Sequence, residues 1–352
     1  MIYLDNAAST PLLPSVKEKL ISCLDVYGNP SSLHDEGFKA RGLINESKEI
    51  ISNKLNCSPD ELYFTSGATM SNSLLLQGFK GKIVCSAIEH EDILMIGSRT
   101  ISVDFNGNLN INELIKCLDA QVSPTIYSIQ FANSEIGTIQ DIKRISQIIH
   151  SYKYSFLHVD ATQYIPHYQV NLKELNIDAL SMSGQKIGCI KGIGLLYISS
   201  NLLPHISPII HGKQGLVGGT ENVLGIACLG EAFNQLSYDN TKMIDLRNML
   251  INGLNGKLIG DNNRLPNNVC MRFDNVEALS IVQLLNEYGI CCSAGSACSS
   301  GDTKPSSTLL AIGLTDKQAN SCIRFTLSKD TTQNDILETI RITNAVIDLL
   351  RE

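Results

Sequence analysis

Six short apolar runs within the first 182 residues constrain the fold of this chain more than any other feature. They lie at residues 61–64, 82–86, 100–104, 124–131, 155–160 and 178–182, and the segments between them show helical spacing or turn residues. Short strands that alternate with helical segments predict a mainly parallel sheet covered by helices. Because ligands of such folds bind where the strands end, we expect a functional site in the loops that follow these runs.

The remaining elements are predicted from apolar residues at helical spacing and from turn signals. Helices are expected over 14–27, 36–56, 276–288 and 332–350, and a long helical segment over 222–255. A turn at 191–194 followed by an apolar stretch at 195–198 predicts a hairpin-like return of the chain after the last run.

Length and charge narrow the class of protein. A chain of 352 residues suits two unequal domains. The formal net charge is −7 and no dense Lys/Arg run occurs, which argues against nucleic acid as a direct ligand. No apolar run approaches the ~20 residues that span a bilayer, and the N-terminus lacks a signal pattern, so no membrane association and a cytoplasmic location are expected.

The eleven cysteines predict neither a disulfide framework nor a metal site. Most lie inside apolar segments, as small buried side chains do in a reducing compartment, and no Cys-x-x-Cys pair occurs. Cys298 is different, because no large apolar side chain occurs between Ser293 and Ser307. This composition predicts a mobile loop, and core packing does not account for a cysteine within it.

Two of the apolar runs lead to an acid and a lysine. The fifth run ends on Asp160 and the sixth leads to Lys186, which leaves room for one crossover connection between two strands. This pair fits a pyridine-aldehyde cofactor: the lysine binds the aldehyde as a Schiff base, and the carboxylate keeps the ring nitrogen protonated. Taken by themselves, however, the two residues are also compatible with an ordinary strand-end aspartate and a surface lysine.

Three other strand ends carry polar groups. Residues 65–69 (Thr-Ser-Gly-Ala-Thr) precede a predicted helix and offer backbone N–H groups to a phosphate, although such turns are often only helix caps. His90 follows the second run, where a lone histidine is more often structural than catalytic. Residues 133–137 (Asn-Ser-Glu-Ile-Gly) follow the fourth run.

Taken together, these stretches resemble the cysteine desulfurases of the NifS/IscS type, which have the class V aminotransferase fold. The resemblance runs through nearly the whole chain in the family's order, at residues 3–11, 28–32, 65–69, 89–90, 135–137, 158–163, 183–186, 219–222, 290–301 and 321–325. The most specific segment is Cys-Ser-Ala-Gly-Ser-Ala-Cys-Ser-Ser-Gly at 292–301.

The resemblance implies an α/β fold, the pyridoxal-phosphate (PLP)-dependent transferase fold type I. A large PLP-binding domain with a mainly parallel seven-stranded sheet is expected over 13–240. A smaller α+β domain is expected to comprise 1–12 and 241–352 and to carry the loop with the catalytic cysteine. A homodimer is also implied.

The resemblance also assigns roles to individual residues. The catalytic residues would be Lys186, which holds the cofactor, His90, which stacks on its ring and moves protons, and the nucleophile Cys298. Asp160 would pair with the pyridine nitrogen, Gln163 with the phenolic oxygen, and Arg324 with the substrate carboxylate. The remaining implied cofactor-binding residues are Ala68, Thr69, Asn133, Ser183, Gln185 and, from a second subunit, Thr220; Asn133 is also expected to bind substrate.

The implied reaction removes sulfur from L-cysteine, giving L-alanine and a persulfide on Cys298 that passes to an acceptor protein, for example for iron–sulfur cluster assembly. Which acceptor and pathway take the sulfur is left open. A selenocysteine lyase or another PLP-dependent β-eliminating enzyme is an alternative. A non-catalytic scaffold or regulator is another, because the chain departs from the family pattern at four places near the cofactor: Met70, Ser134, Gln185 and a shortened 211–220 loop with Lys213 as its only basic residue.

Overall fold

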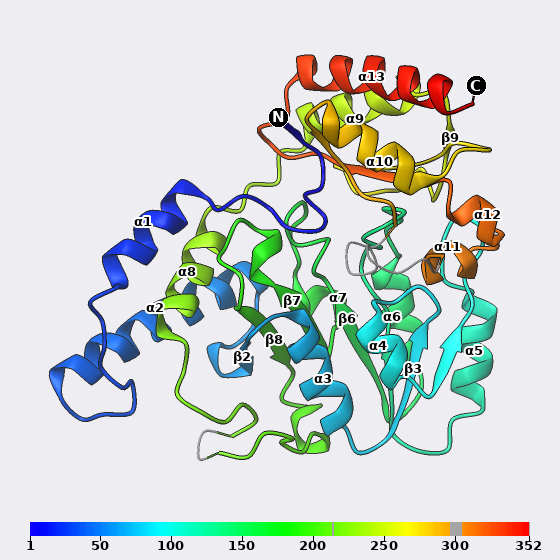
Figure 1. The fold of residues 1–352 in the computed structure, drawn as a ribbon. Coiled ribbons are helices and arrows are strands. Elements are labelled where there is room, and N and C mark those ends of the chain that lie inside the picture. The colour runs from blue at the N-terminus through cyan, green and yellow to red at the C-terminus, as the bar shows by residue number, and fades with distance from the viewer. Residues whose placement is uncertain (213–214, 296–304, 352) are drawn as a thin grey trace.

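The computed structural model of the protein describes residues 1–212, 215–295 and 305–351 (Figure 1). Cys298 and Lys213, both singled out from the sequence, lie outside the described residues. Within the described part, no helix is both long enough and apolar enough to pass through a membrane.

The central sheet has seven strands within the described residues. Their spatial order is β2 (Leu62–Thr65), β8 (Gly194–Ile198), β7 (Ala179–Ser183), β6 (Ser155–Asp160), β5 (Thr125–Ser128), β3 (Lys82–Ser86) and β4 (Arg99–Ile101). β8 is the one strand of this sheet whose direction is opposite to the others, so it is antiparallel to both β2 and β7. It follows β7 in the chain as the predicted hairpin-like return. The mainly parallel sheet is therefore confirmed, and each of the six apolar runs contains or overlaps one of its strands.

Helices cover both faces of this sheet because its strands are apolar on both sides. Along β6, Leu157 and Val159 belong to one buried cluster, whereas Phe156, which directly precedes Leu157, belongs to the opposite one. The first cluster includes side chains from α1 (Pro14–Cys23), α2 (Asp35–Leu55), α5 (Ile111–Asp119), α6 (Ile142–His150) and α8 (Val223–Asn234). The second includes side chains from α3 (Ala68–Gly78) and α4 (Glu91–Ile96), so the molecule has three layers here.

A second, smaller sheet lies beyond one end of the first (Figure 1). In it, β10 (Asn268–Arg272) runs antiparallel between β12 (Cys322–Thr326) and β9 (Lys257–Leu258). Its core includes apolar side chains from α9 (Thr241–Gly253), α10 (Ala278–Glu287) and α13 (Gln333–Arg351), together with Leu4 near the N-terminus. The first residues also pair here, since β1 (Ile2–Tyr3) lies parallel to β11 (Ile290–Cys291).

The long helical segment expected over 222–255 is wrong, because the chain forms two helices there. α8 ends at Asn234 and α9 begins at Thr241. Between them, Asp239 Oδ1 accepts hydrogen bonds from the backbone N–H and the hydroxyl of Thr241, at 3.1 and 2.8 Å. Asn240, which is buried, donates from Nδ2 to the carbonyl of His167. These local bonds of short polar side chains compete with a continuous helix.

Short elements complete the described part of the chain. They are α7 (Leu172–Leu175), α11 (Ser307–Ala311), α12 (Asp316–Ala319) and three 3₁₀ turns, Pro59–Glu61, Gly184–Lys186 and Leu203–His205.

Candidate active site

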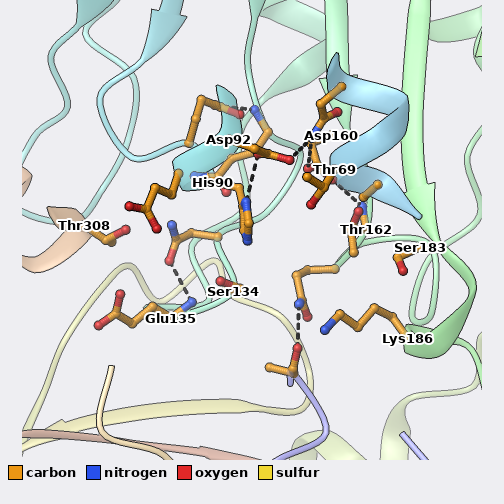
Figure 2. A pocket seen from close by; sticks show the side chains of 18 of the residues that line it. Thr69, His90, Asp92, Ser134, Glu135, Asp160, Thr162, Ser183, Lys186 and Thr308 are labelled. Atoms are coloured by element: carbon orange, nitrogen blue, oxygen red, sulfur yellow. Dashed lines mark hydrogen bonds and ion pairs between the residues drawn. The ribbon is translucent and has the colours of Figure 1, made fainter. Parts of the chain in front are cut away.

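A cavity of about 580 Å³ lies where the parallel strands of the central sheet end (Figure 2). Its walls come mainly from the loops after β2, β3, β5, β6 and β7, where the sequence predicts a site. The structure brings together in these walls ten residues that the sequence singles out: Ala68, Thr69, His90, Asn133, Asp160, Gln163, Ser183, Gln185, Lys186 and Arg324.

Asp160 is the last residue of β6, and its carboxylate is held from two sides. Oδ1 accepts the backbone N–H of Thr162 at 2.9 Å, and Oδ2 accepts Nδ2 of Asn72, on α3, at 3.3 Å. The side chain is buried, and burial raises the pKa of its carboxyl group despite the hydrogen bonds. A cation that entered the cavity beside Asp160 would offset this cost and favour the ionised form.

Lys186 reaches the same cavity from the neighbouring strand. It ends the 3₁₀ turn that follows β7, and its Nζ donates a hydrogen bond to the carbonyl of Ala8, from the N-terminal segment. β6 and β7 are adjacent and parallel, with Asp160 paired to Ser181, so the acid and the lysine emerge from the same edge of the sheet. Figure 2 shows both side chains at the walls of the cavity.

The N-terminus of α3 forms a third wall. α3 starts at Ala68, and its N-cap residue, Gly67, has no side chain that could cap the helix. The first N–H groups of a helix have no partner within the helix, so they can bind an anion, and the helix dipole favours negative charge there. Ser183, at the end of β7, lies beside this turn, since a Cβ added to Gly67 would be 3.6 Å from its Oγ.

His90 lies just before α4 and contacts Asp92. Its Nδ1 is 2.8 Å from Asp92 Oδ1 (Figure 2). Burial acts against ionisation of Asp92, but hydrogen bonds from His90 and Asn72 outweigh it, so the pKa of this carboxyl is lowered. Neighbouring Glu89 is buried, and burial raises the pKa of its carboxyl group well above the usual range.

Arg324 and Glu135 form the wall toward the smaller sheet. Arg324, on β12, is buried; its Nη2 lies 2.8 Å from Asp5 Oδ1, and its Nη1 donates to the carbonyl of Ser134 at 3.3 Å. Glu135 Oε2 accepts the hydroxyl of Ser306 at 2.6 Å. Burial raises the pKa of Glu135 even though this hydrogen bond and Arg324 act in the opposite direction. Within the described residues, Glu135 Oε1 and Arg324 Nε are buried without a hydrogen-bond partner.

Other predicted site residues have partners that define their position. Gln163 Nε2 donates to the carbonyl of Ala7 at 3.0 Å. Asn133 uses its amide to hold its own loop: Oδ1 accepts the N–H groups of Glu135 and Ile136, and Nδ2 donates to a carbonyl of the 86–90 turn. Thr220 is exposed and does not line the cavity of this chain, so its expected role depends on a second copy. The nucleophile expected at Cys298 lies outside the described residues.

Several residues that line the cavity were not predicted as site residues from the sequence: Asn72, Asp92, Glu135, Thr162 and Ser306. Asp5, which pairs with Arg324 behind the cavity wall, was not predicted either. Asp5, Glu135 and Thr162 lie within segments that carry the family resemblance, which was the available signal for them. Asn72 and Asp92 lie inside helices, and a polar residue there gives no indication of what it faces. Across the described ranges, no group of three or more His, Cys, Asp or Glu side chains could hold a metal ion.

The residues of this cavity fit PLP. The lysine amine matches the aldehyde of the cofactor, and the uncapped N-terminus of α3 matches its phosphate. The buried carboxylate of Asp160 has no cationic partner among the contacts above, so it matches the protonated pyridine nitrogen. With the order of the central sheet, they define a PLP-dependent transferase of fold type I.

Comparisons with known proteins agree with this class. The family model described as aminotransferase class-V matches residues 2–338. A cysteine desulfurase IscS of Dictyoglomus turgidum is 37% identical, over 99% of this chain and 95% of its own length. The structure of a NifS-like protein from Rickettsia africae is 32% identical, has a TM-score of 0.91 and is matched over 99% of both chains. The structure of SspA in complex with cysteine is 30% identical, with a TM-score of 0.82, over 93% of this chain and 99% of that one.

The chain therefore belongs to the class V aminotransferase family, among its IscS/NifS-like cysteine desulfurases.

Proposed function

We propose that this protein is a PLP-dependent cysteine desulfurase that converts L-cysteine to L-alanine and retains the sulfur as a persulfide on Cys298. The observation that carries the proposal is the placement of Lys186 and the buried Asp160 at the ends of adjacent parallel strands, facing one cavity. The relatives named above include a cysteine desulfurase and a protein whose structure is in complex with cysteine, and both match nearly the whole chain.

The protein's own groups have distinct tasks in this proposal. Lys186 Nζ binds the cofactor aldehyde, Asp160 pairs with the ring nitrogen, and the N–H groups at the start of α3, with Ser183, bind the phosphate. When bound, PLP withdraws electrons from Cα of the amino acid. Arg324, which lies in the cavity wall, binds the carboxylate of the substrate with its guanidinium fork.

The proton and sulfur transfers balance without an outside oxidant. Once the substrate amine has taken its place, Lys186 Nζ is a free amine and would take the proton from the substrate Cα. The thiolate of Cys298 attacks the substrate sulfur, an S–S bond forms, and the Cβ–S bond breaks with its electron pair left on carbon. One proton then completes the methyl group at Cβ, and Lys186 returns a proton to Cα, which gives L-alanine. Because an ordinary thiol is mostly protonated at pH 7, a base is needed, and we assign that role to His90.

The same proposal extends to organisation and partners. Residues 13–240 form the large domain, and 1–12 with 241–352 form the small one; the separate buried cluster that joins Leu4 to β10, β12 and their helices supports this division. A second copy of the chain supplies Thr220, an acceptor protein removes the persulfide sulfur, and the protein works in the cytoplasm.

Covalent attachment of the cofactor is the direct test. Full-length protein mixed with PLP, reduced with borohydride and digested should carry the cofactor mass on the peptide that contains Lys186. Lys186→Ala should lose this mass, the yellow colour and alanine formation. Lys191→Ala is the matched control, because this exposed lysine five residues later does not line the cavity, and it should behave as wild type. A chain that never binds PLP would instead be a non-catalytic relative.

A further inference from the structure

Asp92 is a charged residue at the cavity to which the proposed reaction gives no role. Its Oδ1 lies 2.8 Å from His90 Nδ1 and also accepts the N–H of Ile93 at 2.8 Å, which fixes the carboxylate at the start of α4. The Asp92 side chain is 11% exposed, whereas that of His90 is 46% exposed. The carboxylate therefore supports the histidine from the protein side, while the ring reaches the opening.

The second oxygen of Asp92 connects His90 to Asp160. Asn72 Nδ2 donates to Asp92 Oδ2 and to Asp160 Oδ2, at 3.3 Å in both cases. An amide nitrogen carries two protons, so it can donate a hydrogen bond to each carboxylate at the same time. His90, Asp92, Asn72 and Asp160 thus form one continuous chain of contacts from α4 through α3 to β6.

The orientation of the Asn72 amide is fixed by a residue of the central sheet. Its Oδ1 accepts the hydroxyl of Ser181, and Ser181 Oγ lies 3.0 Å from Nε2 of His158. His158 is buried, and burial lowers its pKa to about 3, so this imidazole is neutral at physiological pH. Asn72 consequently cannot turn its amide over without losing the contact with Ser181, and its N–H groups stay directed at the two carboxylates.

We infer that Asp92 is a positioning residue for His90. Its carboxylate accepts a hydrogen bond from Nδ1–H, so the neutral ring is held as the tautomer whose lone pair is on Nε2. Asn72, which donates to both carboxylates, fixes the position of Asp92 relative to Asp160. The catalytic part of this inference rests on the function proposed above, whereas the tautomer does not.

Removal of the Asp92 charge should also change the pH dependence of the reaction. The charged or titratable groups around His90 are Asp92, Asp160, Glu89 and the exposed Glu91, with Lys186 across the same cavity. The charge of Asp92 stabilises the protonated ring. Without it, the ring loses its second proton at lower pH, and the acid-side limb of the rate profile should shift to lower pH.

The tautomer can be read directly by long-range ¹H–¹⁵N correlation on full-length protein with labelled histidine, at a pH where the ring is neutral. A His90→Gln variant identifies the signal. We expect wild-type His90 to be protonated at Nδ1 and Asp92→Ala to change to the Nε2-protonated form that free histidine favours. Glu91→Gln is the matched control, since this neighbouring acid is exposed, and it should leave the signal unchanged. An Nε2-protonated wild-type ring, or an Asp92→Ala spectrum like that of wild type, would overturn the inference.

A kinetic test then separates positioning from folding. For Asp92→Asn, kcat for alanine formation should fall about tenfold, less than the ~10²-fold expected from loss of a general base, with KM little changed and the acid limb shifted to lower pH. An unshifted acid limb would contradict the inference. If wild-type protein forms no alanine at all, the proposed function fails, while the tautomer measurement still decides the role of Asp92.

Discussion

Arg324 and Asp5 form an ion pair at the wall of the cavity, although they are 319 residues apart in the chain: Nη2 lies 2.8 Å from Oδ1, and the arginine side chain is only 2% exposed. The guanidinium expected to bind the substrate carboxylate thus already has a carboxylate partner in the protein. Asp5 reduces the cost of a buried cation, and it also competes with the substrate for that cation.

Asp5→Asn should therefore tighten substrate binding and weaken the fold. The amide keeps a hydrogen-bond acceptor but removes the competing charge, so KM for L-cysteine should fall a few-fold. Without substrate, the free energy of unfolding should drop by about 1.5–3 kcal/mol, the range for hydrogen bonds to charged groups. Enzyme kinetics and urea unfolding measure the two effects. Asp274→Asn is the control, because Asp274 forms a second Arg–Asp ion pair, with Arg272. This substitution should leave KM unchanged.

Arg324→Lys should act on substrate binding in the opposite direction. Lysine keeps the charge but lacks the planar fork that matches a carboxylate. We expect KM for L-cysteine to rise about 10- to 100-fold, which corresponds to the loss of one charge-assisted hydrogen bond. Cofactor colour should persist. A KM within twofold of wild type would show that another group binds the carboxylate.

Asp160→Asn should separate cofactor binding from cofactor activation. The amide cannot stabilise a protonated ring nitrogen as a carboxylate does, so kcat should decrease by about 10²-fold or more. PLP should still be found on Lys186 after borohydride reduction. Asp141→Asn is the control: Asp141 accepts the N–H of Arg144 at the start of α6, and asparagine caps a helix equally well.

The parts of the fold and site that could be predicted are those with a local signal. The runs ending at Asp160 and leading to Lys186 place apolar side chains on both faces because both faces of the sheet are covered, so their strands and the cavity at their ends follow from sequence. The interruption between α8 and α9 was missed, because the apolar spacing continues on both sides of the turn at Asp239.

The contacts of Asp92 and Asn72 could not be predicted in the same way. Each is a polar residue in a helix, and its partner is decided by how α3 and α4 pack against the end of β6. That packing depends on side chains far apart in sequence, which no local pattern reports. The same holds for the ion pair of Asp5 with Arg324.

Glu89 should make the stability of the protein depend on pH. Its folded-state pKa is raised above the ordinary value of 4.5, so the folded protein holds a proton that the unfolded chain releases. Unfolding free energy should therefore fall as pH rises above about 4.5, by up to ~1.4 kcal/mol per pH unit, until the folded-state pKa is reached.

Glu89→Gln should remove this dependence, because glutamine does not titrate and its carbonyl can still accept the N–H of Gln130. Urea unfolding between pH 4.5 and 7.5 should show the variant gaining stability relative to wild type as pH rises. Glu91→Gln, at an exposed neighbouring position, should parallel wild type. If the unfolding free energies of Glu89→Gln and wild type changed in parallel with pH, Glu89 would not hold a raised pKa in the folded protein.

In the proposed reaction, Cys298 accepts sulfur from L-cysteine. The most direct measurement is mass spectrometry of PLP-loaded, full-length protein after one turnover with ³⁴S-labelled L-cysteine, with L-alanine quantified in the same sample. We predict that the peptide containing Cys298 gains one heavy sulfur atom in equal amount to the alanine, that Cys298→Ser loses both, and that Cys291→Ser retains both. Alanine formed by Cys298→Ser at the wild-type rate, with sulfur released as free sulfide, would contradict this account.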